Sequence, residues 1–130
     1  MDANAQIVTG FLIKNNLRLA VAESLTGGLV QSKIVALEGS SGFFSGGLTA
    51  YIIGMKVHLL GVDRAEAERT NAVAPQIAEH MAKGICGLMK SQVGIGTTGY
   101  AEPDENLQVA IPYAYIGGLY QPCRRYCMPL

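Results

Sequence analysis

Two groups of hydroxyl and glycine residues follow predicted β-strands, and both could do chemistry. They are Ser24-Leu25-Thr26-Gly27-Gly28 and Thr97-Thr98-Gly99. A serine hydroxyl is a candidate nucleophile when a base accepts its proton. Glycines at the start of a helix let backbone N–H groups approach an anion such as a phosphate. The alternative for the first group is structural: Thr26 caps a helix and the glycines form a tight turn.

Lys56 lies 32 positions after Ser24, in a segment with few other charges. An apolar pocket disfavours the charged ammonium and lowers its pKa, so a buried lysine can act as a general base toward a serine hydroxyl. Spacing alone does not show that the two residues meet, and the alternative is that Lys56 is a surface residue of a short helix. His58 and His80 have no companion motif such as G-x-S-x-G, so we interpret them as ordinary helix residues.

The sequence predicts neither a metal site nor a cofactor. Cys86, Cys123 and Cys127 form no CxxC pair, and the acidic residues have no spacing typical of metal ligands. An odd number of cysteines without such a pair favours reduced thiols over a disulfide framework.

These residues must be positioned by strands and helices that alternate along the chain. Hydrophobic periodicity predicts helices over residues 3–15, 30–37, 55–60, 64–70 and 75–90, and strands over 18–22, 44–53, 92–97, 113–119 and 124–128. A polar turn is predicted over 98–106. The alternation indicates the α/β class: a single-domain layered sandwich with a largely parallel sheet, covering residues 1–130. Ligands bind such sheets beyond the carboxyl ends of the strands, where both hydroxyl groups lie.

Composition excludes several partners. Ten Lys and Arg balance ten Asp and Glu, and no basic run is longer than Arg124–Arg125, so we expect no nucleic-acid binding. No apolar run approaches the roughly 20 residues that span a bilayer, so we expect no membrane segment. The amino terminus lacks a basic stretch before its first apolar patch, which favours a cytoplasmic protein over a secreted one.

Taken together, several segments resemble the CinA C-terminal domain family, from about residue 5 to residue 120. The matching segments are Ala22-Glu23-Ser24-Leu25-Thr26-Gly27-Gly28, Gly39-Ser40-Ser41, Tyr51 with Lys56 five positions later, Leu60-Gly61-Val62, Asn71-Ala72-Val73 and Thr98-Gly99-Tyr100-Ala101 with Pro103. The resemblance implies a hydrolase without metal or cofactor. Such an enzyme cleaves the carboxamide of nicotinamide mononucleotide and gives nicotinic acid mononucleotide and ammonia.

The resemblance also implies roles for individual residues. Ser24 would be the nucleophile and Lys56 its proton acceptor, while Tyr51 and Thr98 would line and support the same site. Backbone donors for the nucleotide phosphate or for an oxyanion would come from the glycine-rich turns. These substrate-binding residues are Thr26, Gly27, Gly28 and Gly99. Glu23 belongs to the match and is given only a supporting or structural role.

The chain departs from the family pattern in four places. Ile52-Ile53-Gly54 replaces the polar Ser-Asn-Glu that usually follows Tyr51, Pro112 replaces a glycine, and Glu102 replaces another glycine. A carboxylate at that last position would repel a phosphate if it faced the pocket. The sequence also stops at Leu130, before the family's Gly-Asp-Arg motif and last helix. Loss of this helix should expose a sheet face and favour a homo-oligomer.

These departures leave a second function open. The alternative to an amidohydrolase is a catalytically degenerate family member that binds a nucleotide or a protein partner.

Overall fold

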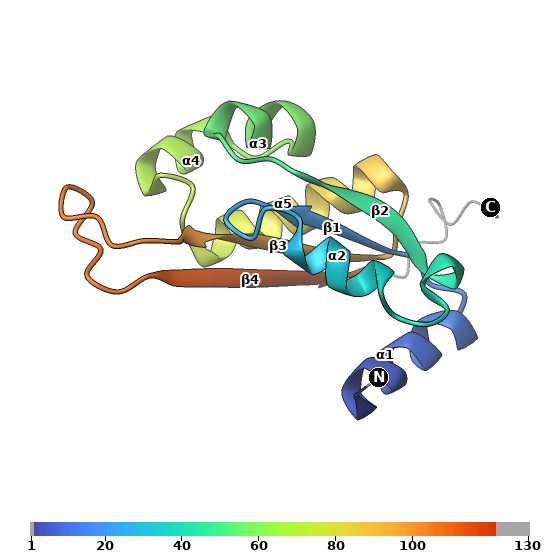
Figure 1. The fold of residues 1–130 in the computed structure, drawn as a ribbon. Helices are drawn as coiled ribbons and strands as arrows, with labels where there is room; N and C mark the ends of the chain where they lie inside the picture. Colours follow the sequence, from blue (N-terminus) through green and yellow to red (C-terminus); the bar gives the residue numbers. More distant parts are fainter. Residues whose placement is uncertain (1, 122–130) are drawn as a thin grey trace.

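The computed structural model describes residues 2–121 and contains one four-stranded sheet with helices on both faces (Figure 1). In chain order the elements are α1 (Ala3–Lys14), β1 (Leu19–Glu23), α2 (Leu29–Val35), the 3-10 helix η1 (Ser40–Gly42), β2 (Phe44–Thr49), α3 (Ile53–Leu60), α4 (Arg64–Thr70), α5 (Pro75–Met89), β3 (Val93–Tyr100) and β4 (Tyr113–Tyr120).

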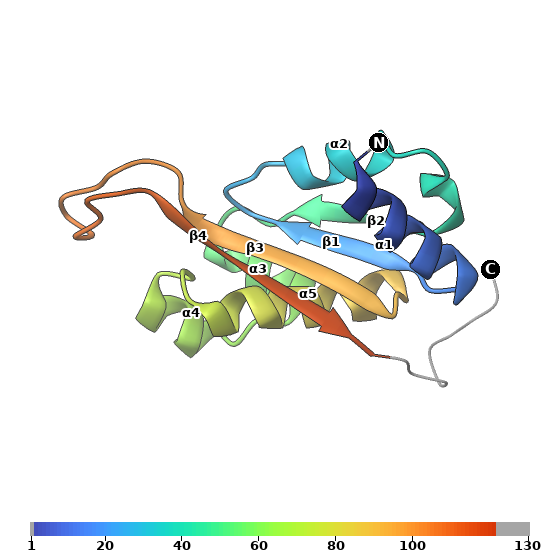
Figure 2. The ribbon, with the colours of Figure 1, turned by 90° about the horizontal axis from the view of Figure 1, so that it is seen from below.

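The sheet confirms the predicted α/β class. Its strand order is β2-β1-β3-β4, with β1 parallel to both of its neighbours and β4 antiparallel to β3. Helices α1 and α2 cover one face, and α3, α4 and α5 lie on the other (Figures 1 and 2). The carboxyl ends of the three parallel strands therefore share one edge of the sheet, which is where an α/β protein places its ligand site.

Strand β1 is buried on both faces, as a central parallel strand must be. Leu19 and Val21 pack on the side of α1 and α2, and Ala20 and Ala22 pack beneath α5. Side chains alternate between the faces of a strand, so the small alanines leave room for α5 to lie close to the sheet.

Glycines in β3 bring α5 still closer to the sheet backbone. A Cβ on Gly94 would lie 2.4 Å from the Ala82 carbonyl oxygen, and one on Gly96 would lie 2.2 Å from that of Ala78. Neither carbonyl can move away without distorting the helix. This close contact fixes the distance between α5 and the end of β3 that reaches the site.

The predicted turn over residues 98–106 is wrong at its beginning. Strand β3 continues to Tyr100, because Thr98, Gly99 and Tyr100 pair with the first residues of β4. A Cβ on Gly99 would meet the Tyr113 carbonyl oxygen at 2.3 Å, so this glycine serves close strand pairing rather than a turn.

Two other predicted boundaries differ in the structure. Strand β2 ends at Thr49 rather than residue 53, and α3 begins at Ile53 rather than residue 55. The strand predicted over 124–128 lies outside the described residues.

Strand β4 is uncovered on the side of the sheet that α1 and α2 cover elsewhere. Ile116 on this strand is 77% exposed. The homo-oligomer expected from such an exposed face stays a prediction. No helix within residues 2–121 is both long and apolar enough to cross a membrane.

Replacing Gly96 tests the close contact between α5 and β3. We expect Gly96→Ala to lower the free energy of unfolding by about 2–3 kcal/mol, because the added methyl group overpacks against the α5 backbone. Gly87→Ala is the matched control, because Gly87 lies in α5 itself and a Cβ there meets nothing within 4 Å. That substitution should be neutral or stabilise by up to about 1 kcal/mol. Urea unfolding measures both, and equal effects would contradict the packing argument.

Candidate active site

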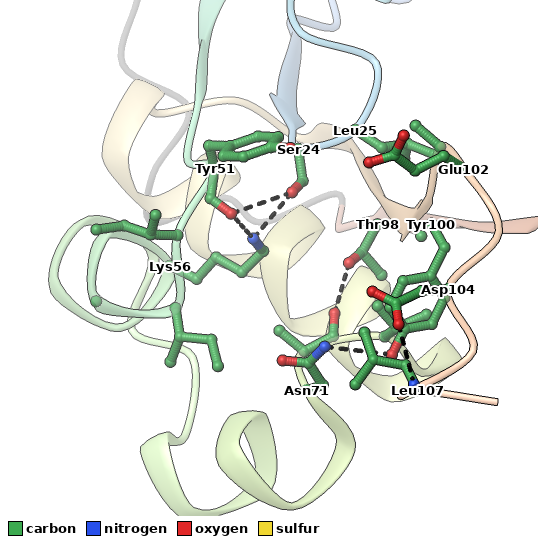
Figure 3. Close-up of a pocket in the computed structure, with 17 residues that line it drawn as sticks. Ser24, Leu25, Tyr51, Lys56, Asn71, Thr98, Tyr100, Glu102, Asp104 and Leu107 are labelled. Atoms are coloured by element: carbon green, nitrogen blue, oxygen red, sulfur yellow. Dashed lines mark hydrogen bonds between the residues drawn. The ribbon is translucent and has the colours of Figure 1, made fainter. Parts of the chain in front are cut away.

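A pocket of about 570 Å³ opens at the carboxyl ends of the parallel strands. Ser24 directly follows β1, Tyr51 follows β2, and Thr98 and Gly99 belong to the last part of β3. Lys56 enters from the first turns of α3, and Figure 3 shows its amine directed at the Ser24 hydroxyl. The structure thus brings together five of the residues that the sequence singled out.

Ser24 and Lys56 are in direct contact. The Lys56 Nζ lies 2.9 Å from the Ser24 Oγ, and Lys56 and Ser24 are only 2% and 6% exposed. The alternative reading of Lys56 as a surface residue is therefore wrong. Its helix is short, but α3 begins immediately after the turn at Tyr51, which directs Lys56 back into the pocket.

Burial sets the protonation of Lys56. Desolvation lowers its pKa from the ordinary 10.5 to about 8. Within residues 2–121 no carboxylate forms a salt bridge with this amine, so no ion pair offsets the desolvation. Close to half of the Lys56 side chains are neutral near pH 8, and a neutral amine can accept a proton from a serine.

Tyr51 contributes its backbone to the site. Its carbonyl oxygen accepts a hydrogen bond from the Lys56 Nζ at 2.6 Å, while its side chain is 70% exposed at the rim of the pocket. The same carbonyl lies 3.5 Å from the Ser24 Oγ. Once Lys56 is neutral, an N–H directed at Tyr51 leaves the nitrogen lone pair available to Ser24.

Thr97 is a site residue that the sequence reasoning did not select. Its buried hydroxyl accepts a hydrogen bond from the Ser24 backbone N–H at 3.3 Å and pairs with the Thr26 hydroxyl at 2.8 Å. It therefore holds both ends of the Ser24–Thr26 turn against β3. Its place in the second hydroxyl group was the available signal, but only the strand direction shows that Thr97 faces this turn.

The Glu23 carboxylate occupies the place at the start of α2 where the helix N–H groups could otherwise bind a ligand anion. Its buried carboxylate accepts hydrogen bonds from the N–H groups of Val30 and Gln31, both at 3.0 Å, and from the Gln31 side chain at 2.8 Å. Burial alone would raise the pKa of Glu23, but these bonds together with one from Thr26 hold it below its usual value. The Val30 and Gln31 N–H groups at the start of α2 are therefore already used inside the protein and are not available to a ligand anion.

The glycine-rich turn next to Glu23 has a conformational role. Gly27 and Gly28 have φ values of 59° and 105°, which favour glycine, and Gly28 is the N-cap of α2. The alternative in which Thr26 caps this helix is wrong. Thr26, Gly27 and Gly28 are not among the described residues that line the pocket, whereas Leu25 is.

A loop between α4 and α5 forms the opposite wall. Asn71 and Ala72 have φ values of 54° and 57°, a strained region for residues with a Cβ. The Thr98 hydroxyl donates a hydrogen bond to the Ala72 carbonyl, and the Asn71 amide reaches the Tyr100 hydroxyl at 3.4 Å. Thr98 therefore supports the pocket wall, and Asn71 and Tyr100 join the site residues that the sequence reasoning had not selected.

The remaining candidates lie away from this pocket. His58 and His80 are exposed on α3 and α5 and line no part of it, as expected of ordinary helix residues. Burial raises the pKa of the Cys86 thiol to about 11, so it is a poor nucleophile. No cluster of three or more metal-ligating side chains occurs within residues 2–121, and Cys123 and Cys127 lie outside the described residues.

The fold and site define a class: an α/β domain with a Ser–Lys pair at the carboxyl edge of its sheet. Residues 1–119 match the family model for the CinA C-terminal domain, and the chain belongs to that family. It is 43% identical over 102 residues to a CinA-like protein of Desulfotalea psychrophila, which covers 78% of this chain and 25% of the relative. A CinA-like protein of Shewanella loihica is 36% identical over 94% of this chain and 30% of its own length.

Solved structures show the same fold. A CinA superfamily protein from Escherichia coli has a TM-score of 0.75 at 27% identity, covering 92% of this chain and 76% of the other. One from Enterobacter cloacae has a TM-score of 0.73 at 33% identity, covering 77% and 59%. The chain thus spans only 25% and 30% of the two CinA-like relatives, but more than half of each of these solved chains.

Removing the Lys56 amine tests its desolvation. Because the pKa of Lys56 is about 8 in the folded state and higher when unfolded, the unfolded chain binds more protons between these values. The free energy of unfolding should therefore rise as pH increases from 8 toward 10.5, and the penalty is fully present below pH 8. We expect the rise between pH 7 and pH 10 to be about 2.5 kcal/mol larger in the unmodified protein than in Lys56→Met.

Urea unfolding of both proteins at the two pH values measures this difference. The raised pKa of the buried Cys86 thiol also makes the free energy of unfolding depend on pH, but Cys86 is present in both proteins, so the subtraction removes its contribution. Parallel curves for the two proteins would mean that burial does not lower the pKa of Lys56.

Proposed function

We propose that this protein is an amidohydrolase of the nicotinamide-mononucleotide deamidase type. It would convert nicotinamide mononucleotide to nicotinic acid mononucleotide and ammonia by a Ser/Lys mechanism. The observation that carries the proposal is the buried Lys56 amine 2.9 Å from the Ser24 hydroxyl, with its pKa lowered to about 8. A nucleophile within hydrogen-bond reach of a base is the arrangement that acyl transfer needs.

In the first half of the reaction, neutral Lys56 accepts the Ser24 proton as Oγ attacks the carboxamide carbon. A tetrahedral intermediate forms, and its oxyanion needs nearby hydrogen-bond donors. Within residues 2–121 the backbone N–H groups of Leu25 and Thr26 have no acceptor in the protein, and Leu25 lines the pocket. Because Leu25 lines the pocket and Thr26 does not, we assign the oxyanion to the Leu25 N–H.

Protonated Lys56 then donates its proton to the leaving nitrogen, and the C–N bond breaks to release ammonia. This leaves an ester between Ser24 and the acyl group, and Lys56 is neutral again. In the second half Lys56 accepts a proton from water as the water oxygen attacks the ester. Returning that proton to Ser24 Oγ frees the carboxylic acid and restores the starting pair.

Ammonia release from nicotinamide mononucleotide is the direct test. We expect Ser24→Ala to abolish it to background while leaving the fold intact, because the substitution removes the attacking oxygen. Ser41→Ala is the matched control, because Ser41 is exposed on η1 and lies outside the pocket. Undiminished release by Ser24→Ala would contradict the proposed nucleophile. Ligand binding without release would instead favour the degenerate, binding-only alternative.

The pH dependence tests Lys56 as the base. The rate should increase with pH and level off above about 8, because only the neutral amine accepts the serine proton. Lys56→Arg retains a cation that cannot deprotonate near neutral pH, so turnover should fall by at least a hundredfold while ligand affinity persists. Substantial turnover by Lys56→Arg would eliminate the mechanism.

Thr97→Val tests whether Thr97 positions the nucleophile. Loss of the hydroxyl removes the acceptor for the Ser24 N–H while nearly preserving shape, so we expect kcat to fall about tenfold or more with little change in KM. Thr97→Ser keeps the hydroxyl and should restore most of kcat. Steady-state kinetics of the two variants decide the matter. Equal kcat in Thr97→Val and the unmodified protein would show that the hydroxyl is dispensable.

A further inference from the structure

The charges around the pocket do not suit a phosphate. Among the lining residues within the described range 2–121, Lys56 is the only one of the Lys, Arg and His types, and Glu102 and Asp104 are the acidic ones. In the proposed mechanism Lys56 is neutral when it accepts the serine proton. These described lining residues then carry two negative charges and no positive charge. Figure 3 shows both carboxylates on the wall across from Lys56.

The Asp104 charge is fixed in place. Its Oδ1 accepts hydrogen bonds from the N–H groups of Asn106 and Leu107, at 2.9 and 3.2 Å, and its backbone pairs with Val109. The residue is half-buried at the edge of the pocket. Glu102 belongs to the same loop and also lines the pocket.

The two tyrosines that line the pocket supply no positive charge either. Tyr51 lies at the rim and is largely exposed, and Tyr100 packs edge-on against Tyr113 with ring centroids 5.4 Å apart. The helix terminus nearest Ser24 does not compensate, because Glu23 already occupies the first N–H groups of α2.

We propose that the pocket selects a cationic pyridinium carboxamide that carries no phosphate, so that the ribonucleoside of nicotinamide is a better substrate than its mononucleotide. This inference rests on the proposed amidohydrolase function and narrows its substrate class. The reaction is unchanged: the carboxamide C–N bond breaks, water supplies the oxygen, and nicotinic acid riboside and ammonia form. Glu102 and Asp104 are then the residues that determine specificity, by attracting the ring cation and repelling a phosphate.

The test compares kcat/KM for ammonia release from nicotinamide riboside and from nicotinamide mononucleotide at low salt. We expect the riboside to be favoured by about tenfold or more, with the preference shrinking as salt screens the exposed Glu102. Glu102→Gln and Asp104→Asn keep the shape of the loop, and in the second variant the new amide oxygen can still accept the two backbone bonds. Each substitution should reduce the preference severalfold, and the pair by about tenfold.

Glu105→Gln is the matched control, because Glu105 is exposed on the same loop and does not line the pocket. Its preference should equal that of the unmodified protein. Ammonia release with the mononucleotide equal to or better than the riboside would overturn the inference and leave the proposed function standing.

A binding measurement distinguishes failure of the amidohydrolase function from failure of the proposed substrate selection. Calorimetric titration of Ser24→Ala with each compound reports affinity without turnover. Ammonia from neither compound would overturn the amidohydrolase function, yet tighter binding of the riboside would still support the selection of a phosphate-free cation. Equal or tighter binding of the mononucleotide would overturn the inference that the pocket selects a phosphate-free cation.

Discussion

Burial of the Lys56 amine beside Ser24 is the constraint on which the site depends, because an ammonium held away from water and without a carboxylate partner is costly to the fold. The protein meets this cost by favouring the neutral amine, which lowers the pKa to about 8. A single acidic side chain next to Lys56 would relieve the cost and remove the base. Ile53, the apolar first residue of α3, packs against the core and lines the pocket without offering the amine a charged partner.

The sheet and its close contact with α5 fix the relative positions of Ser24 and Lys56. Parallel pairing aligns the ends of β1, β2 and β3, so Ser24, the Tyr51 carbonyl and Thr98 arrive at one edge from distant parts of the chain. Gly96, just before Thr97, keeps the helix against β3. The nucleophile thus belongs to a turn that rigid elements fix on both sides, which suits a geometry that must be held to a fraction of an ångström.

Hydrogen bonds inside the turn link the site to α2. Ser24 donates its backbone N–H to Thr97, Thr97 pairs with Thr26, and Thr26 and the start of α2 bond to the Glu23 carboxylate. An internal carboxylate at this helix start fixes the turn firmly, but it also removes a binding place for a ligand anion. The same arrangement that orders the nucleophile therefore shapes which substrates the pocket accepts.

Local pattern in the sequence determined the α/β class, the bounds of most helices and the candidates Ser24, Lys56 and Thr98, while the family resemblance added Tyr51. This was possible because periodicity and residue type are properties of short segments. The family departure at Glu102 was also visible there. Tertiary structure alone decided that Lys56 is buried against Ser24, that Tyr51 acts through its carbonyl, and that Thr98 and Gly99 are strand residues. Those outcomes depend on which strands pair and on how far a side chain lies from water, and both are set by segments distant in the chain.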